Sequence, residues 1–280
     1  MNQIIMLGTG NATVTQCYNT CFLLETSTTR LLVDAGGGNG VLRQLQRAGV
    51  AIRDLHHLFV THAHTDHVLG VIWVIRMVAQ CKDYEGHLHV YGHDKVLLVL
   101  RTIIDMILAK KQLARVAQRV VFHQLEDGDR FPVGDMTIQC FDIHSTKEKQ
   151  YGFRAELPRS VSPASASDGV PASPLSGGLA LGDEPYNPAN RPLVEQADWL
   201  MAEAFCLYAD HETFKPYEKS HSTALDAGRL ASELGVRHLI LYHTEEKTLA
   251  TRKVAYAQEA AQQYDGPVLV PDDLEVIPLD

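Results

Sequence analysis

Three histidines and an aspartate lie within the six positions from 62 to 67, just after the apolar segment LFV. Other candidate metal ligands also follow short apolar segments: His144 follows FDI, Asp183 follows LALG, and His243 follows LILY. Side chains at the ends of packed strands converge on one edge of a sheet, where a rigid scaffold holds them. The sequence therefore predicts one site built from four distant segments, and the fold must bring those strand ends together.

Strands and helices are expected to alternate along the chain, in two strand-rich halves, and no internal repeat of 20 to 50 residues is visible. Hydrophobic periodicity and end signals predict helices over the segments 39–50, 68–80, 95–119, 222–235 and 249–264. Residues 158–178 are nearly all Pro, Ser, Gly and Ala, and such a segment buries too little apolar surface to hold a fold. We expect a single domain over residues 1–280, with 158–178 as a flexible loop inserted in it.

The overall charge argues against a general affinity for nucleic acid, since the formal net charge is −9. The first residues contain no basic region followed by an apolar stretch, and no apolar run is long enough for a membrane span. The five cysteines form an odd, scattered set, which is typical of a reduced protein. We expect a cytoplasmic protein without a membrane partner.

Seven side chains are candidate metal ligands, and this number suits two ions better than one, because a single ion takes about four. They are His62, His64, Asp66, His67, His144, Asp183 and His243. Two dications about 4 Å apart repel each other, and carboxylates offset that charge. This explains why the set contains Asp66 and Asp183 beside the histidines. A hydroxide held between two such ions is nucleophilic near neutral pH. A solvated polar loop would seldom contain four potential ligands in one short turn, so we favour the metal site.

The segment THAHTDH resembles the His-x-His-x-Asp-His signature of metallo-β-lactamase-fold hydrolases, and is most similar to that of the ribonuclease Z branch. The resemblance covers most of the chain, through LGTGNA, LLVDAGGG, HSTKEKQYGFR, LALGDEP, MAEAF, HSTALDAGRLA and LILYHT. It implies an α/β fold of four layers, αββα, in which helices flank two mixed β-sheets. It also implies two divalent metal ions, with zinc expected and manganese or iron as alternatives.

The resemblance assigns roles to individual residues. It implies that His62, His64 and His144 bind the first metal, that Asp66, His67 and His243 bind the second, and that Asp183 bridges both. His221 would protonate the leaving group, and Glu203 would hold the ring of His221 in the correct tautomer. Asp66, His221 and Glu203 are therefore the expected catalytic residues. The branch usually forms homodimers, so we expect a homodimer here.

Two departures from the branch concern the substrate. Its last ligand is usually followed by a Ser-x-Arg-Tyr stretch, whereas Thr244, Glu245 and Glu246 follow His243 here. In place of the long tRNA-binding arm the chain has only the Pro/Ser loop, whose single basic residue is Arg159, and phosphate contacts supply much of the affinity for RNA. We expect a phosphodiesterase whose substrate is a small phosphodiester, such as a cyclic nucleotide or a short oligonucleotide, or RNA.

Other interpretations remain open at this point. A hydrolase of the same fold could cleave a lactone, a thioester or a sulfate ester. Redox di-iron proteins of the fold typically have Glu where His64 stands and carry a flavin domain, and a non-catalytic binding protein would not need the complete ligand set. The basic stripe Lys111, Arg115 and Arg119 on one predicted helix face could contact phosphates, but a solvated helix face is the commoner structure.

Overall fold

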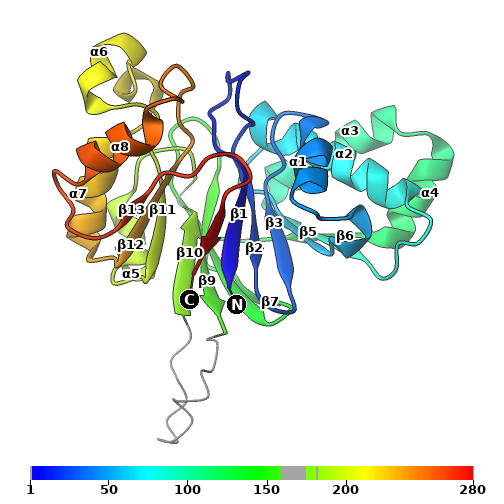
Figure 1. Cartoon of the computed structure of the whole chain (residues 1–280). Helices are drawn as coiled ribbons and strands as arrows, with labels where there is room; N and C mark the ends of the chain where they lie inside the picture. The colour runs from blue at the N-terminus through cyan, green and yellow to red at the C-terminus, as the bar shows by residue number, and fades with distance from the viewer. Residues whose placement is uncertain (1, 159–174, 181, 280) are drawn as a thin grey trace, which may run out of the picture.

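The computed structural model describes residues 2–158, the backbone of 175–180, and residues 182–279. Most of the predicted loop 158–178 therefore lies outside the described residues. Within the described part, two seven-stranded sheets lie face to face at the centre of the molecule, as Figure 1 shows.

The first sheet has the strand order β14-β1-β2-β3-β4-β5-β6. Its strands are β1 (Gln3–Gly8), β2 (Cys21–Glu25), β3 (Arg30–Val33), β4 (His57–Phe59), β5 (Leu88–Gly92), β6 (Val120–Gln124) and β14 (Val276–Pro278). The pairs from β14 to β3 are antiparallel, and the pairs from β3 to β6 are parallel. Parallel neighbours end at the same edge, so the segment that follows β4 starts beside the segment that follows β3.

The second sheet has the strand order β13-β12-β11-β10-β9-β8-β7. Its strands are β7 (Arg130–Val133), β8 (Met136–Asp142), β9 (Tyr151–Leu157), β10 (Leu175–Ala180), β11 (Trp199–Glu203), β12 (His238–Tyr242) and β13 (Val268–Leu269). The strands β10 to β13 run parallel to one another, so the ends of β10, β11 and β12 share one edge.

Helices cover the outer face of each sheet (Figure 1). On the first sheet these are α1 (Gly40–Arg47), α2 (Thr65–Gln80), α3 (Asp94–Ile107) and α4 (Lys110–Arg119); on the second they are α5 (Arg191–Val194), α7 (Ala224–Leu234) and α8 (Arg252–Ala260), with the short α6 (His211–Phe214) beyond them. One apolar cluster lies between the sheets, and one lies under each helical layer. The predicted four-layer αββα arrangement is confirmed.

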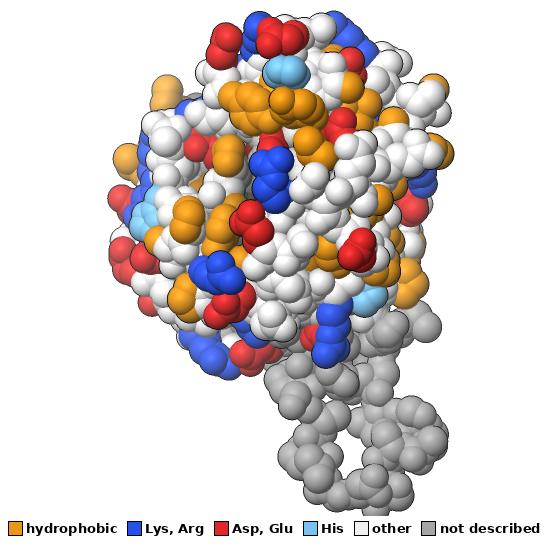
Figure 2. Space-filling view, turned by 90° about the vertical axis from the view of Figure 1, so that its left-hand side faces the viewer, with side chains coloured by type: hydrophobic (Ala, Val, Ile, Leu, Met, Phe, Trp, Pro, Cys, Tyr) orange, Lys and Arg blue, Asp and Glu red, His pale blue; other side chains and the backbone are white. Residues whose placement is uncertain are grey.

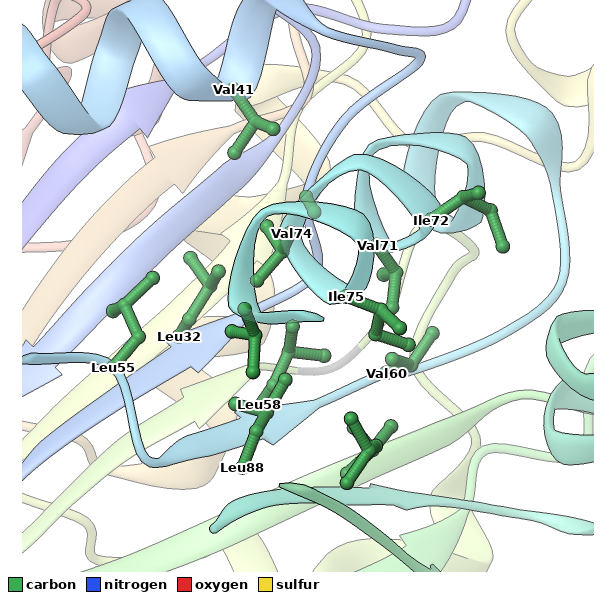
Figure 3. Close-up of a cluster of buried hydrophobic side chains, with 14 of the residues drawn as sticks. Leu32, Val41, Leu55, Leu58, Val60, Val71, Ile72, Val74, Ile75 and Leu88 are labelled. Carbon is green, nitrogen blue, oxygen red and sulfur yellow. The ribbon is translucent and has the colours of Figure 1, made fainter. Parts of the chain in front are cut away.

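Helix α2 is the centre of the apolar cluster on the first sheet. Figure 3 shows Val71, Val74 and Ile75 directed from α2 toward Leu58 of β4 and Leu88 of β5. The structure confirms the predicted helix, and apolar residues occur around most of its circumference, as is typical of a buried helix. None of the helices in the described residues combines the length and the apolar character that a membrane span requires.

The predicted helix over 95–119 is wrong as one element, because the chain breaks it at Leu108 and Ala109 into α3 and α4. Both residues adopt extended backbone angles, and the side chain of Gln112 accepts a hydrogen bond from the backbone N–H of Ala109 at 3.0 Å. No proline or glycine marks the break. The last helix, α8, is shorter than the predicted 249–264, and β10 begins at Leu175, inside the segment expected as a loop.

The basic stripe on α4 has a structural role. Arg119 donates hydrogen bonds to the carbonyl oxygens of Val78 and Cys81, and Arg115 donates to that of Ala79. These carbonyls belong to the last turn of α2 and the residue after it, where helical partners are missing. A guanidinium also stabilises the negative end of a helix dipole. Two of the three stripe residues therefore cap α2 instead of facing solvent or a phosphate.

Candidate metal centre and its cavity

The predicted ligands meet where the strands of both sheets end. His62, His64, Asp66 and His67 lie between the end of β4 and the first turn of α2, while Asp183 follows β10 and His243 follows β12. His64, Asp66, Asp183 and His243 line a cavity of ≈ 510 Å³, whereas His62 and His67 are buried and do not line it. Its other lining residues are Asn11, Ala12, Thr13, Ala63, Thr65, Lys147, Phe205, Lys219 and His221.

Three groups of possible metal ligands occur in the described residues; the third combines His243 with Glu203 and His221, and the other two consist of predicted ligands alone. His62, His64 and Asp183 form one group, Asp66, His67 and His243 form the other, and within each group the ligand atoms lie within 4.8 Å of one another. The Oδ2 atom of Asp183 lies 3.6 Å from Nε2 of His62 in its own group. It also lies 4.0 Å from Nε2 of His67 and 3.8 Å from Nε2 of His243 in the second. Asp183 thus stands between the groups, in the position that a bridging carboxylate requires.

Several buried polar atoms at this point lack a hydrogen-bond partner. They are Nε2 of His62, His67 and His243, Oδ2 of Asp66 and Oδ1 of Asp183. An unpaired buried polar atom costs roughly 1–3 kcal/mol, so a cluster of them is unfavourable unless something binds it. Imidazole nitrogens and carboxylate oxygens are donors that zinc, manganese and iron accept. The residues present therefore fit two divalent metal ions.

Asp34, which the sequence analysis did not select, holds two of these groups in place. Its Oδ2 lies 2.7 Å from Nδ1 of His67 and accepts a hydrogen bond from the Thr61 hydroxyl at 2.8 Å, and its Oδ1 accepts from the Thr61 N–H. Thr61 Oγ1 in turn lies 2.9 Å from Nδ1 of His62. A carboxylate on the far nitrogen fixes the ring so that the other nitrogen points at the metal. Asp34 ends an apolar strand as the other candidates do, and this signal could have identified it.

A glycine lets the first turn of α2 approach Asp34. A Cβ atom on Gly70 would lie 1.8 Å from the carbonyl oxygen of Ala35, so no side chain fits at this position. The N–H of Gly70 donates to the carbonyl of Gly36, and the N–H of Ala35 donates to the carbonyl of His67. The segment after β3 is therefore fastened to the start of α2, which positions His67 against Asp34.

The electrostatics of the cluster follow from its mixture of acids and imidazoles. Burial alone would raise the pKa of Asp66, but His67 and His243 outweigh it and hold that pKa far below its usual range. Burial opposes the charged form of His67, yet Asp66 and Asp34 raise its pKa well above the ordinary value. Burial, together with His67, lowers the pKa of His62. Asp66 is thus ionised, as a carboxylate that binds a metal must be.

His221 and Glu203, the other predicted catalytic pair, are in contact. Nδ1 of His221 lies 3.1 Å from Oε2 of Glu203, whose Oε1 accepts a hydrogen bond from the Ser222 hydroxyl. The His221 ring stacks on Phe205, with centroids 4.7 Å apart, and its centroid lies 5.4 Å from that of His243. Because Glu203 occupies Nδ1, the remaining nitrogen, Nε2, is the one left for a substrate.

His144 is the predicted ligand that the structure does not bring into either group. Its side chain is exposed, and its backbone N–H donates to Oδ1 of Asp142 at 2.7 Å. Asp34, His144 and His243 all adopt left-handed backbone conformations, with φ of 55°, 56° and 58°. Such strained conformations at strand ends cluster at functional sites. The role of His144 as a ligand stays a prediction.

The two acids that replace the usual stretch after the last ligand do not line the cavity. The carboxylate of Glu245 is buried and accepts hydrogen bonds from the backbone and hydroxyl of Thr248 and from the hydroxyl of Tyr256. Glu246 accepts from the backbone N–H groups of Thr15 and Gln16. They therefore fasten loops, one of which leads to the cavity wall at Asn11 to Thr13, and do not repel a phosphate in the cavity directly. The other substrate-related residue, Arg159, lies outside the described residues.

Comparisons with known proteins agree with this architecture. The family model described as Anti-Pycsar protein Apyc1 matches residues 2–168, more than half of the chain. A ribonuclease Z of Streptomyces avermitilis is 28% identical over 100% of this chain and 98% of its own, and one of Bradyrhizobium diazoefficiens is 28% identical over 79% and 82%. The crystal structure of the metallo-β-lactamase-fold protein YhfI from Bacillus subtilis has a TM-score of 0.72 at 22% identity, covering 99% of this chain and 100% of that one. The chain belongs to the family of the anti-Pycsar protein Apyc1, and it is a metal-dependent hydrolase of the ribonuclease Z-like branch of the metallo-β-lactamase fold.

Proposed function

We propose that the protein hydrolyses small phosphodiesters, such as a cyclic nucleotide or a short oligonucleotide, at a centre of two divalent metal ions. The observation that carries this proposal is the set of unpaired buried nitrogen and oxygen atoms around the carboxylate of Asp183. Relatives named ribonuclease Z support phosphodiester chemistry. The cavity supports a small substrate, because its volume of ≈ 510 Å³ is that of a small-molecule site. The net charge of −9 disfavours a large nucleic acid.

The residues that would hold the metals are the two groups described above, with Asp183 shared between them. When bound there, divalent ions supply an activated water near neutral pH and offset the charge of a phosphate. Zinc is the ion that we propose, because it accepts imidazole and carboxylate ligands in an open coordination sphere. Asp66 contributes a negative charge at the second group, and Asp34 keeps His67 turned toward the site.

Two lysines in the cavity support an anionic substrate. Lys147, in the segment after β8, and Lys219, in the turn before α7, both line the cavity beside the metal ligands. Among the described residues, neither ammonium group has a carboxylate partner within 4.0 Å, whereas Lys95, Lys149 and Lys253 each form an ion pair. Unpaired cations on an acidic protein favour a phosphate at this place.

His221 is the proposed acid for the leaving group. In the reaction, a water oxygen forms a bond to phosphorus, the bond from phosphorus to the leaving oxygen breaks, and the His221 proton moves to that oxygen. The products are an alcohol and a phosphate monoester. The proton released by the water passes to solvent, from which His221 regains its own. Glu203 stabilises the protonated ring through Nδ1.

The His221→Ala variant tests this role. General acid catalysis typically contributes about 10²–10⁴-fold, and the contribution is largest for a poor leaving group. The variant should therefore lose that factor on an alkyl phosphodiester and much less on bis(p-nitrophenyl) phosphate, whose leaving group departs without a proton. Glu203→Gln should show a weaker version of the same pattern. Equal losses on both substrates, or loss of metal from His221→Ala, would mean that His221 binds or ligates instead.

Metal content tests the centre itself. We expect close to two transition-metal ions per chain by elemental analysis, and a lower content in His64→Ala. His211→Ala is the matched control, because His211 lies far along the chain in α6 and lines neither group of ligands. Measuring His144→Ala in the same series decides whether this exposed residue is a ligand. A chelated wild type that still hydrolyses substrate contradicts the proposal.

The substrate class follows from a parallel assay of the metal-loaded protein. We expect turnover of cyclic nucleotides and short oligonucleotides to exceed turnover of pre-tRNA, because the described cavity offers two lysines but no extended basic surface. A lactone, a thioester and a sulfate ester belong in the same assay. If one of these three compounds is hydrolysed faster than the phosphodiesters, its class is the substrate class and the phosphodiester proposal is wrong.

We also propose a homodimer located in the cytoplasm. The five cysteines are free thiols in the structure, as expected in a reducing compartment. Trp73 of α2, together with Leu98 and Met106 of α3, is partly or largely exposed on the first helical layer and offers an apolar surface for a second copy. Light scattering at micromolar concentration tests the dimer. A monomeric mass would contradict the proposed dimer but not the proposed reaction.

A further inference from the structure

A second cavity adjoins the metal cavity and shares a single lining residue with it. It has a volume of ≈ 280 Å³ and lies between the segment 184–186, the end of β11 and helix α7. His221 is the shared residue, since it lines both cavities, while none of the predicted metal ligands lines the second one. The second cavity therefore begins where the proposed proton donor stands.

The chemistry of this second cavity is mixed aromatic, apolar and polar. Tyr186 and Tyr217 supply rings, and Pro185, Ala227 and Leu230 supply apolar surface. The cavity belongs to the side of the molecule that carries α6, α7 and α8, where Figure 2 shows acidic, basic and hydrophobic side chains interspersed. Because no single sign of charge covers this face, the lining itself decides what binds.

The open hydrogen-bonding groups of the second cavity can be identified by elimination. The Glu184 carboxylate accepts hydrogen bonds from the Ser145 hydroxyl and the Thr146 N–H, at 2.6 and 3.0 Å. Asp226 accepts from the hydroxyls of Thr223 and Tyr217, at 2.6 and 2.7 Å. Glu203 is engaged with His221 and Ser222, so three of the four acids that line the cavity are bound within the protein, and the fourth, Glu233, is exposed.

Tyr186 and Arg229 are different. The hydroxyl oxygen of Tyr186 is buried and has no hydrogen-bond partner among the described residues. The guanidinium of Arg229 lies 3.6 Å from Asp226, and about half of its side chain is exposed, so its remaining N–H groups are available. A ligand that offers acceptors to these two groups, and a flat surface to the rings, would satisfy the cavity.

The position of the second cavity assigns its occupant to one end of the substrate. The proton donor must touch the leaving oxygen, while the phosphate lies among the metal ligands and lysines of the first cavity. The group attached to the leaving oxygen must then extend from His221 away from the metal ligands. The cavity that His221 also lines, and that contains none of those ligands, offers room for this group.

We propose that the second cavity is the subsite for the leaving group and that it takes a nucleoside, whose base contacts Tyr186, Leu230 and Arg229. This assignment rests on the proposed phosphodiesterase function and names the substrate's leaving side. An alkyl group would leave the Tyr186 hydroxyl unpaired, whereas a nucleobase offers both a π-face and carbonyl or ring-nitrogen acceptors. The volume is close to the lower end of small-ligand sites, about 300 Å³, which suits one nucleoside.

The test compares two substrates in three variants of the metal-loaded full chain. Tyr186→Phe removes only the hydroxyl, Leu230→Trp fills the cavity, and Tyr208→Phe is the matched control, since Tyr208 is exposed and lines neither cavity. We expect kcat/KM on a dinucleoside monophosphate such as ApA to fall about 3- to 10-fold in Tyr186→Phe, the value of one neutral hydrogen bond. The fall in kcat/KM on ApA should be larger in Leu230→Trp, because the indole fills the cavity. Both should lose less on bis(p-nitrophenyl) phosphate, and the control should keep both activities.

A binding measurement separates failure of the subsite from failure of the proposed function. Calorimetric titration with adenosine and with uridine should show binding to the wild type, and severalfold weaker binding to Tyr186→Phe. If the wild type cleaves phosphodiesters but binds neither nucleoside, or if both variants lose equally on the two substrates, the subsite is wrong and the function stands. If it cleaves no phosphodiester yet binds a nucleoside through Tyr186, the function is wrong, and the cavity is a nucleoside site without a leaving-group role.

Discussion

Single residues outside the ligand set control how the ligands are presented. Asp34 contacts His67 through one carboxylate oxygen and Thr61 through both, and Thr61 contacts His62, so one acid orients a ring in each metal group. Without the carboxylate, the buried ring of His67 could rotate or change tautomer, and its Nε2 would no longer be held toward the site.

The Asp34→Asn variant should weaken metal binding while the protein stays folded. The amide keeps the size of the side chain but offers one acceptor oxygen in place of two, so its NH2 group must face either the Thr61 N–H or the pair formed by the Thr61 hydroxyl and His67. Loss of such an outer contact typically costs about 10- to 100-fold in metal affinity. Competition with a chelator measures this directly, and circular dichroism checks the fold. An unchanged affinity would show that the site holds its rings without Asp34.

The candidate site could be predicted from the sequence to the extent that its chemistry is local. His62, His64, Asp66 and His67 sit in one turn, so their types and spacing are visible without a structure. Asp34 could have been selected because it follows an apolar strand, but its role could not be assigned, because its partner His67 is 33 residues away and only the pairing of β3 with β4 brings them together. The second cavity beside His221 depends on how α7 packs against the sheet, and no local pattern in the sequence indicates it.

At the scale of elements, the helical layer on the first sheet depends on polar contacts between helix ends. Arg119 and Arg115 of α4 bind the carbonyl groups at the end of α2, which is the helix whose first turn carries the metal ligands. The stripe of basic residues was visible in the sequence, but the target of these side chains was not. Spacing along one helix says which residues share a face and not which element that face meets.

Arg119→Gln should lower the stability of the protein without affecting the chemistry. The variant loses a charge-assisted contact with two carbonyl oxygens at the negative end of α2, and we expect a loss of about 1–2 kcal/mol in the free energy of unfolding. Lys111→Gln is the control, since Lys111 is an exposed cation on the same helix. Urea unfolding of both variants, together with their metal content, is the measurement. Equal stability in the two variants would contradict the capping role.

The elements themselves were predictable where periodicity and end signals agree. Helix α7 was predicted over 222–235. It begins after the N-cap Thr223, whose side chain forms a capping box with Asp226, and it ends at Gly235 in the left-handed conformation. The break between α3 and α4 was not predictable, because Leu108 and Ala109 are good helix formers. At these two residues tertiary packing outweighs helix propensity, and no local sequence pattern indicates the break.

On the scale of the whole molecule, one buried cation joins segments from both ends of the chain. Arg252 of α8 is almost fully buried, and it donates hydrogen bonds to the hydroxyls of Thr9 and Thr244, to the carbonyl of Pro271 and to the carboxylate of Asp272. Thr244 follows the ligand His243, and its N–H donates to the carbonyl of Thr9. The guanidinium thus connects the segment after His243 with the segment between β13 and β14, which leads from the second sheet to the first.

Arg252→Met should destabilise the whole protein. Methionine fills a similar volume but leaves several buried acceptors without a donor, and we expect a loss of roughly 2–4 kcal/mol in the free energy of unfolding. Lys253→Met is the matched control, because Lys253 is the next residue and pairs with Asp272 and Glu275 at the partly exposed surface, where ion pairs contribute about 0–1 kcal/mol. Thermal unfolding distinguishes the two. A loss in Lys253→Met as large as in Arg252→Met would remove the special role of the buried cation.

The pairing of β1 with β14 has a consequence for how a cell makes this protein. Strand β1 is synthesised long before β14, so it stays an open edge of its sheet until Val276 to Pro278 have been made, because only then can Ile4 pair with Ile277. During that interval an apolar strand with free backbone groups can recruit another chain. Nascent chains stalled shortly before residue 276 should therefore depend on chaperones, and release of the remaining residues should end that dependence.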